Sequence, residues 1–274
     1  MPELPEVETV KEVLKTKILK RKIINVTINY PNIIEYPTVQ QFVQQIKNQT
    51  IIDLNRRGKW LMFELNDYYL LSHLRMEGKF NLKSSKDEIN KHEHIIFEFD
   101  DGSQLRYQDT RKFGKMHLII KNEVNDRKPL NELGLEPFDN NLTVKYLEEK
   151  FQRRKNLSIK SVLLDQKVIV GIGNIYANEI LFSCKISPFK KANLLNSSEL
   201  QSIIDNTKKI LKQAIIDGGT TIRSYTSSEG VHGRFQQNLL VHMKDNQPCP
   251  NCGRLIVKEK INGRGTYFCP DCQK

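Results

Sequence analysis

Hydrophobic and polar positions follow two different periods along this chain, and the helical period comes first. Val7, Val10 and Leu14 recur on one face after Pro5, so residues 5–18 are predicted to form an amphipathic helix. Apolar and polar residues then alternate in short runs, which is the period of half-buried strands. The pattern predicts strands over 23–30, 50–54, 60–65, 68–74, 94–99, 104–107 and 113–121, and a second helix over 38–47.

The pattern changes after residue 121. Residues 122–141 contain Asn, Asp, Pro and Gly with little periodicity, so we place an interdomain linker there. This order predicts an α+β fold, in which an N-terminal β-sandwich with a leading helix precedes a helical domain. Helical spacing is found over 143–154, 161–168, 174–184 and 197–217, short strands return in the last forty residues, and the predicted domains are 1–132, 133–235 and 236–274.

Four cysteines near the C-terminus have the spacing of a zinc ribbon. Cys249 and Cys252 form one CxxC pair, and Cys269 and Cys272 form a second one sixteen residues later. Each pair can place two sulfurs about 2.3 Å from one metal ion. Two redox dithiols or two disulfides are the alternatives, but neither requires this paired spacing in a small terminal unit. We therefore predict one zinc ion, which is structural because four thiolates leave no open position for water.

Composition indicates an anionic partner. The net charge is +11 and the pI is near 9.3, which suits both nucleic acid and a membrane surface. No apolar run approaches the ~18 residues of a membrane span, and the N-terminal sequence is too acidic for a signal peptide. Cys184 lies in an apolar stretch and is interpreted as a core residue. The lack of a membrane span indicates no membrane partner, and five cysteines, of which four are assigned to zinc, indicate a reducing cytoplasm.

The N-terminus carries a candidate nucleophile. Methionine aminopeptidase normally removes Met before Pro, so we expect the mature chain to begin with the secondary amine of Pro2. A free α-amine titrates near ~7.7–8.0, and its attack on an aldehyde carbon gives an electron-withdrawing iminium. Glu3 and Glu6 lie within one helical turn of it. The alternative is an ordinary helix start, where Pro and acidic residues are both favoured.

Six ordered motifs together show a resemblance. They are Pro2–Thr9, Arg57–Lys59, His73–Gly78, Asp109–Gly114, Gly171–Glu179 and the cysteine ribbon with Arg264 between its two pairs. The chain resembles the bacterial formamidopyrimidine-DNA glycosylase (Fpg/MutM) family, bifunctional DNA repair enzymes for oxidised purines, over its whole length. Leu4 is informative because the sister endonuclease VIII-type enzymes, which act on oxidised pyrimidines, usually begin PEGPE.

The resemblance implies a mechanism and its catalytic residues. Pro2 attacks C1′ of the deoxyribose while Glu3 donates a proton to the sugar ring oxygen, and β- and δ-elimination then cut both sides of the abasic site. Lys59 and Arg264 assist proton transfer and phosphate activation, and Glu6 orients Pro2. Taken alone, Lys59 is a surface charge and Arg264 a solvated charge at a hairpin tip.

The resemblance also implies the DNA contacts. Met76 and Phe113 fill and wedge the stack that the flipped base leaves, although single residues of these types are more often core. Arg111 reads the estranged cytosine. Asn174 binds a phosphate on the helix–two-turn–helix element, where the glycines of Gly171–Gly173 let backbone N–H groups approach an anion or simply allow close packing. The partner is double-stranded DNA with an oxidised purine, and we expect a monomer.

Two further basic positions have competing interpretations. Lys155 belongs to a basic cluster that any solvated helix can carry, but against DNA it supplies salt-dependent affinity. His92 matches a family DNA contact, and the alternative is a metal site with His94. We disfavour that site because successive strand positions alternate between faces.

Two segments of the C-terminal half stand out. Val241–Lys244 departs from the Val-Tyr-Gly-Arg or Val-Tyr-Gly-Lys that relatives often carry, so the packing of the ribbon on its domain is expected to differ in detail. Residues 217–235 resemble the mobile lesion-recognition loop of the family.

One rival function is the same chemistry on oxidised pyrimidines, which Leu4 and the trio of Met76, Arg111 and Phe113 disfavour. The other is a catalytically silent zinc-ribbon DNA-binding protein, which needs no free N-terminal proline.

Overall fold

The computed structural model describes residues 1–220 and 233–274, and the chain divides into two compact units. Of the described residues, unit 1 contains 1–2, 6–131 and 233, and unit 2 contains 3–5, 132–220 and 234–274. The N-terminal residues Glu3, Leu4 and Pro5 therefore pack with the C-terminal half of the chain.

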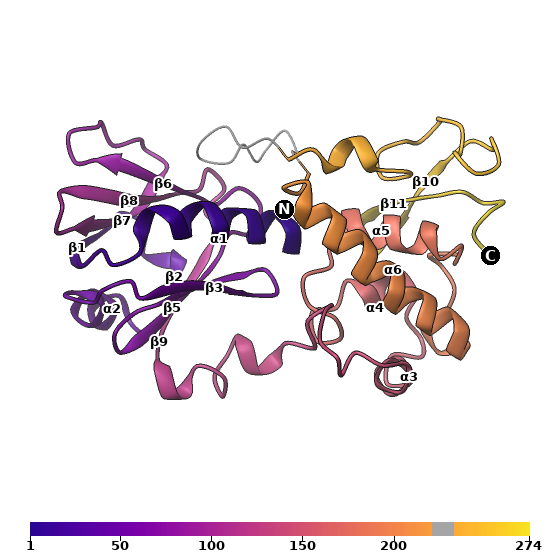
Figure 1. Cartoon of the computed structure of the whole chain (residues 1–274), viewed down its shortest axis with the longest axis horizontal. Helices are drawn as coiled ribbons and strands as arrows, with labels where there is room; N and C mark the ends of the chain where they lie inside the picture. The colour runs from indigo at the N-terminus through magenta and orange to yellow at the C-terminus, as the bar shows by residue number, and fades with distance from the viewer. Residues whose placement is uncertain (221–232) are drawn as a thin grey trace. The chain divides into compact units, whose positions relative to one another are not determined.

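Unit 1 is a β-sandwich (Figure 1). One sheet has the strand order β1-β7-β8-β6 and is antiparallel throughout. The other has the order β2-β9-β5-β4-β3 and is parallel only between β2 and β9. The strands are β1 (Ile23–Ile28), β2 (Ile34–Tyr36), β3 (Asp53–Arg57), β4 (Trp60–Glu64), β5 (Tyr68–His73), β6 (Lys79–Ser84), β7 (Glu93–Phe99), β8 (Ser103–Gln108) and β9 (Lys115–Ile120).

Two helices accompany the sandwich, and local sequence explains both. Helix α1 (Leu4–Ile18) has an acidic first turn and buries Val7, Val10 and Leu14, as their spacing predicts. Helix α2 (Val39–Ile46) begins at a capping box, in which Thr38 and Gln41 each accept from the other's backbone N–H.

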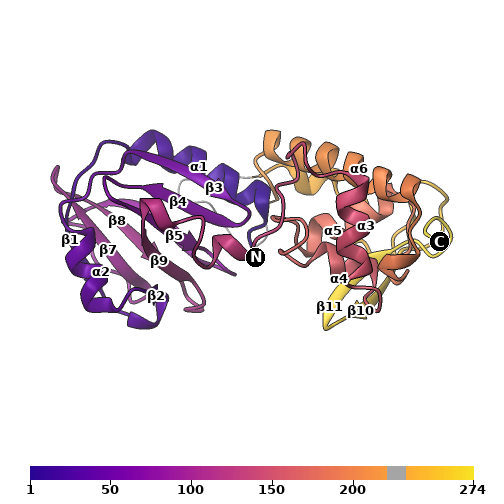
Figure 2. The same cartoon turned by 90° about the horizontal axis from the view of Figure 1, so that it is seen from below.

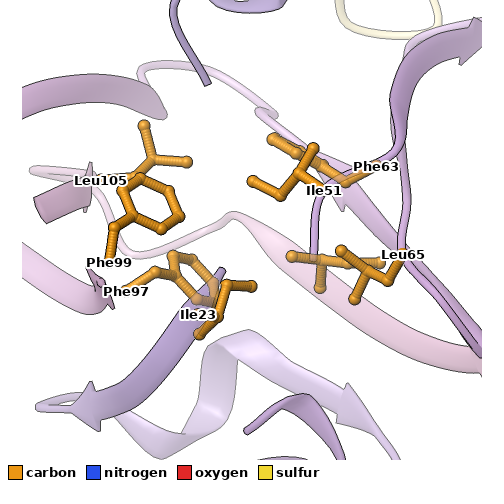
Figure 3. Close-up of a pocket in the computed structure, with 8 residues that line it drawn as sticks. Ile23, Ile51, Phe63, Leu65, Phe97, Phe99 and Leu105 are labelled. Carbon is orange, nitrogen blue, oxygen red and sulfur yellow. The ribbon is translucent and has the colours of Figure 1, made fainter. Parts of the chain in front are cut away.

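Side chains from both sheets meet in one apolar core. Figure 3 shows residues of the two layers pointing toward each other around a cavity of about 10 Å³. A cavity of that size barely admits one water molecule, and an apolar lining keeps it dry. Between the described residues of the two sheets, this cavity therefore leaves no room for a ligand. The labelled lining residues are Ile23, Ile51, Phe63, Leu65, Phe97, Phe99 and Leu105.

Unit 2 combines four helices with a β-hairpin (Figures 1 and 2). Helix α5 is apolar on almost every side and buried, because α4, α6 and strand β11 all pack on it. Helix α6 starts with a capping box between Asn196 and Glu199. The elements are α3 (Val144–Gln152), α4 (Ile159–Leu163), α5 (Asn174–Ser183), α6 (Ser197–Ile216), β10 (Val257–Ile261) and β11 (Arg264–Phe268).

The structure confirms the predicted fold class and differs from the sequence prediction in several elements. Strands β2 and β6 were missed, because the first has three residues and the second only two apolar positions. The strand predicted over 50–54 corresponds to β3, which begins later, at Asp53, and ends at Arg57. The helix predicted over 161–168 is α4, which begins earlier because Ser158 caps its first turn. No helix within the described residues is long and apolar enough to cross a membrane.

Candidate active site and nucleic-acid interface

The Glu3 carboxylate lies at the N-terminus of helix α5. It accepts hydrogen bonds from the backbone N–H groups of Gly173 (2.6 Å), Ile175 (2.9 Å) and Tyr176 (3.4 Å), and Glu3 is only 2% exposed. The first N–H groups of a helix have no partner within it, and the helix dipole favours an anion there. Glu3 is therefore held in one position by groups that cannot rotate away.

The two glycines before α5 make room for this N-terminal segment. A Cβ on Gly173 would lie 2.3 Å from Cδ of Glu3, and a Cβ on Gly171 would lie 2.5 Å from Leu4. Gly171 also has a φ of +89°, and its carbonyl oxygen accepts from the Leu4 N–H at 3.0 Å. The sequence interpretation placed a phosphate against these backbone groups, but the group that accepts from them is the Glu3 carboxyl.

Arg264 is exposed at the tip of the β10–β11 hairpin. The tip is the pair Asn262-Gly263, with φ values of 48° and 75°, which is the sequence and conformation of a type I′ turn. The next carbonyl, that of Gly265, accepts from Asn174 Nδ2 at 3.0 Å and from Lys160 Nζ at 2.9 Å. The structure thus places Asn174 against the residue that follows Arg264, and two side chains from the helices hold this end of the hairpin.

Lys160 is a residue of this site that sequence reasoning missed. It is fully buried in α4 and also donates to Thr266 Oγ1 at 2.9 Å. Burial, followed by the nearby charge of Arg264, lowers the pKa of Lys160 to about 7. No motif marks this position, because a lysine in a short apolar helix looks like any other helical lysine.

The four cysteines have the geometry of a zinc site. Their Sγ atoms all lie within 4.8 Å of one another, with 3.8 Å between Cys249 and Cys272 and 3.5 Å between Cys252 and Cys269. Tetrahedral thiolates about 2.3 Å from zinc are roughly 3.8 Å apart, whereas a disulfide needs about 2.0 Å. The set therefore fits one structural zinc ion, as predicted. Cys184 is half-buried at the end of α5 and takes no part.

Loss of the zinc ion is expected to release the hairpin. Cys249 and Cys269 belong to the apolar cluster that packs on Phe182 of α5, so the ribbon and the helices stabilise each other. Cys249→Ser should lose the metal, disorder the ribbon and weaken DNA binding, while circular dichroism shows the rest folded. Cys184→Ser is the matched control and should keep both metal and affinity. Normal DNA binding by metal-free protein would show that the ribbon is not a DNA contact.

Lys59 lies in unit 1 at the turn between β3 and β4. Arg57 pairs with Trp60, so Gly58 and Lys59 form a two-residue turn with Gly58 at a φ of 57°. Lys59 is only 5% exposed, which excludes the plain surface charge that the sequence alone suggested. Pro2 and Glu6 are buried as well, with Glu6 in the first turn of α1.

Met76 lies in a turn whose conformation depends on His73. The ring Nδ1 of His73 accepts from the Arg75 N–H at 3.0 Å, and Arg75 has a φ of 53°. Burial, with the charges of Arg75 and Lys59, lowers the pKa of His73 to about 3, so the ring stays neutral and remains an acceptor. Met76 itself is half-buried rather than part of the core.

Arg111 and Phe113 protrude from the turn between β8 and β9. Phe113 is 49% exposed, and the Arg111 guanidinium lies 4.8 Å from the centre of its ring. An exposed phenylalanine leaves apolar surface in water, so it adds little to the stability of the fold. The core alternative for Phe113 is thereby excluded, and the pair is available to a base stack.

The remaining basic candidates lie on surface turns. His92 is half-buried, and its ring lies 6.5 Å from that of His94. His92 precedes β7, and strand positions two apart share a face, so the alternation argument was wrong. His94 is instead engaged by the Asp109 carbonyl oxygen at 2.9 Å. Lys155 is exposed after α3, whereas its neighbour Arg154 forms an ion pair with Asp165.

The segment 241–244, unusual in sequence, is firmly held. The Glu179 carboxylate accepts from the N–H groups of Leu240, Val241 and His242 at 2.8–3.1 Å. Asn178 Nδ2 lies 2.8 Å from His242 Nδ1, and burial lowers the pKa of His242 to about 4. The segment is thus hydrogen-bonded to α5 despite its departure in sequence. Of the loop predicted over 217–235, residues 221–232 lie outside the described residues.

Comparison with known proteins places the chain. Family models match residues 1–116 (formamidopyrimidine-DNA glycosylase N-terminal domain), 133–226 (its H2TH domain) and 246–274 (zinc finger found in FPG and IleRS). Formamidopyrimidine-DNA glycosylase from Shouchella clausii is 47% identical over 274 residues, covering 100% of this chain and 99% of that protein. The Oceanobacillus iheyensis protein of the same name is 46% identical, with 100% and 98% covered.

Solved structures agree with the sequence comparison. A Lactococcus lactis FPG mutant in complex with DNA containing Fapy-dG has a TM-score of 0.93 and 39% identity, with 100% of both chains covered. MutM in complex with DNA containing carbocyclic 8-oxo-G has a TM-score of 0.91 and 38% identity, also with 100% of both covered. These matches define a DNA glycosylase built from a β-sandwich, an H2TH domain and a four-cysteine zinc finger. The chain belongs to the formamidopyrimidine-DNA glycosylase family.

Proposed function

We propose that this protein removes oxidised purines, including 8-oxoguanine and formamidopyrimidines, from duplex DNA and then cleaves the abasic site. The observation that carries this proposal is the position of Glu3, the residue directly after Pro2. Three backbone N–H groups at the start of α5 donate to its carboxyl group. A carboxyl group fixed beside an N-terminal secondary amine is the arrangement that iminium chemistry requires. The solved relatives bound to Fapy-dG and 8-oxo-G DNA support the substrate class.

The chemistry starts at the Pro2 nitrogen. Its lone pair forms a bond to C1′ of the deoxyribose, and the bond from C1′ to the base breaks with its electrons going to the base, which takes up the proton that the Pro2 nitrogen loses. Glu3 supplies the proton that opens the sugar ring, and the product is an iminium on Pro2. The iminium acidifies C2′, so loss of a C2′ proton expels the 3′ phosphate and a second elimination expels the 5′ phosphate.

The other residues bind and orient. Lys59 and Arg264 are assigned to proton transfer and phosphate activation, and their cationic heads suit a phosphate oxygen. Glu6 orients the start of α1. Asn174 lies against the Gly265 carbonyl beside Arg264, which suits a shared phosphate. The four cysteines would hold a zinc ion, which would supply rigidity to the hairpin rather than chemistry.

The DNA contacts follow from exposure. Phe113 and Met76 wedge and fill the stack, Arg111 reads the orphaned cytosine, and His92 and Lys155 bind the backbone. We propose the division into 1–132, 133–235 and 236–274, action as a monomer, and location in the bacterial cytoplasm on the nucleoid.

A substrate comparison tests the proposal directly. Duplexes with 8-oxoguanine opposite cytosine should yield both β- and δ-elimination products, while duplexes with an oxidised pyrimidine react much more slowly. Faster cleavage of the pyrimidine substrate would favour the sister activity. Binding without any cleavage would favour the catalytically silent alternative.

Arg111 is expected to set the preference for the opposite base. Donation to the acceptor-rich edge of cytosine should discriminate by roughly 1–3 kcal/mol against adenine. Arg111→Ala should therefore flatten the preference for cytosine over adenine in single-turnover excision of 8-oxoguanine.

Lys155→Ala is the control for this effect. A phosphate contact carries no base information, so its loss should weaken both substrates alike and reduce the salt dependence of binding. If Arg111→Ala keeps the preference for cytosine, the opposite base is read elsewhere.

A further inference from the structure

Tyr107 places a hydroxyl group between two turns of unit 1. It is fully buried in β8, and its ring packs on Phe80 at a centroid distance of 5.1 Å. A Cβ on Gly78 would lie 2.2 Å from the Tyr107 hydroxyl oxygen, and a Cβ on Gly114 would lie 1.7 Å from it. The hydroxyl therefore occupies a slot that only glycine can line on both sides.

The two glycines belong to the turns that carry the proposed base-stack residues. Gly78 ends the turn that contains Met76, and Gly114 directly follows Phe113. The Gly78 N–H donates to the Leu74 carbonyl oxygen at 2.9 Å, which closes the first turn. Tyr107 thus lies against both turns at once, and its hydroxyl leaves no room for a side chain on either glycine.

Asp109 organises the second turn from within. It is 0% exposed, and its Oδ2 accepts from the Gly114 N–H at 2.8 Å while Oδ1 accepts from the Arg111 N–H at 3.1 Å. The Tyr107 hydroxyl lies 3.4 Å from the same Oδ2. One buried carboxylate therefore holds the backbone on both sides of Lys112, which has a φ of 57°.

The backbone of Asp109 joins a third element. Its N–H donates to the His92 carbonyl oxygen at 3.0 Å, and its own carbonyl oxygen lies 2.9 Å from His94 Nε2. A buried carboxylate and a buried hydroxyl are costly unless they are bonded, and here their hydrogen bonds include those to the backbone of the Arg111–Phe113 turn. The arrangement suits a need for fixed positions, because each polar group bonds or touches a turn that carries a proposed DNA contact.

We propose that Tyr107 and Asp109 are positioning residues, which hold the Met76 turn and the Arg111–Phe113 turn at the spacing that opposite-base discrimination requires. The inference rests on the proposed function, because it takes Arg111 as the group that reads the base. Neither residue touches the DNA in this proposal. They act by limiting where Arg111 and Phe113 can move.

Tyr107→Phe tests the proposal with a minimal change. It removes one oxygen from the slot between the glycines and leaves the ring in the core, so the variant should fold. We expect the ratio of excision rates opposite cytosine and adenine to fall about three- to tenfold, a fraction of what a lost bidentate contact gives. Cleavage of a preformed abasic site, which needs no reading of a base, should change much less.

Tyr146→Phe is the matched control. It removes the hydroxyl that donates to the Val168 carbonyl oxygen at 2.8 Å in unit 2, far in sequence from both turns. It should leave the cytosine-to-adenine ratio unchanged even if the melting temperature falls. If Tyr107→Phe and the wild type have the same cytosine-to-adenine ratio, whatever the change in stability, Tyr107 only fills the core and the proposal is overturned.

A double variant separates this inference from the proposed function. If Tyr107 acts through Arg111, adding Tyr107→Phe to Arg111→Ala should not change the ratio further. A further fall in that background would contradict action through Arg111. Absence of 8-oxoguanine excision, or of any cytosine preference in the wild type, would instead contradict the proposed function itself.

Discussion

Glu3→Gln should lower excision of 8-oxoguanine by about 10²–10⁴-fold, the usual contribution of a positioned acid or base. The amide cannot release a proton to the sugar ring oxygen. It also loses position, because Oε2 accepts from Gly173 and Tyr176 and Oε1 from Ile175, and an amide nitrogen can accept from none of them. Pro2 remains, so the variant should still open a preformed abasic site to some degree.

Single-turnover assays on the two substrates measure this split. Glu12→Gln is the matched control, since it makes the same change in the same helix at a side chain that is 63% exposed. It should retain activity on both substrates. Equal rates of 8-oxoguanine excision for Glu3→Gln and the wild type would remove Glu3 from the role of acid.

Retention of Met1 should abolish both steps of the reaction. With Met1 attached, the Pro2 nitrogen is a tertiary amide whose lone pair is delocalised into the carbonyl group, so it cannot attack C1′. Protein purified from cells with inhibited methionine aminopeptidase should bind lesion DNA but neither excise the base nor cleave the abasic site.

Treatment of that protein with methionine aminopeptidase should restore activity in proportion to the Pro2 termini formed. The normally processed protein, treated in the same way, is the control and should not change. Full activity with Met1 in place would show that another group is the nucleophile.

The sequence predicts those parts of the fold that depend on local chemistry. The spacing of Val7, Val10 and Leu14 predicts α1, and the paired CxxC spacing predicts the zinc site. The hairpin tip is predictable as well, since Asn262-Gly263 is the preferred type I′ pair. Strand β6 was missed because its two apolar positions give too little periodicity, although pairing with β8 stabilises it.

The site is predictable only as far as its motifs reach. Glu3 and Gly173 are both in recognisable motifs, but nothing local states that the carboxylate of one binds the N–H of the other. The glycines before α5 were taken to admit a phosphate, because a glycine does not reveal which group approaches it. Lys160 and Tyr107 went unnoticed for the same reason, since their roles come from contacts with residues far along the chain or in other turns.

Borohydride trapping tests the central claim, that Pro2 is the nucleophile, most directly. Reduction during reaction with duplex DNA that contains 8-oxoguanine opposite cytosine should link protein and DNA covalently, because borohydride reduces the iminium to a stable amine. Mass spectrometry of the peptides should place the deoxyribose remnant on the Pro2 nitrogen. An adduct on Lys59 or any other lysine, with Pro2 unmodified, would contradict the account.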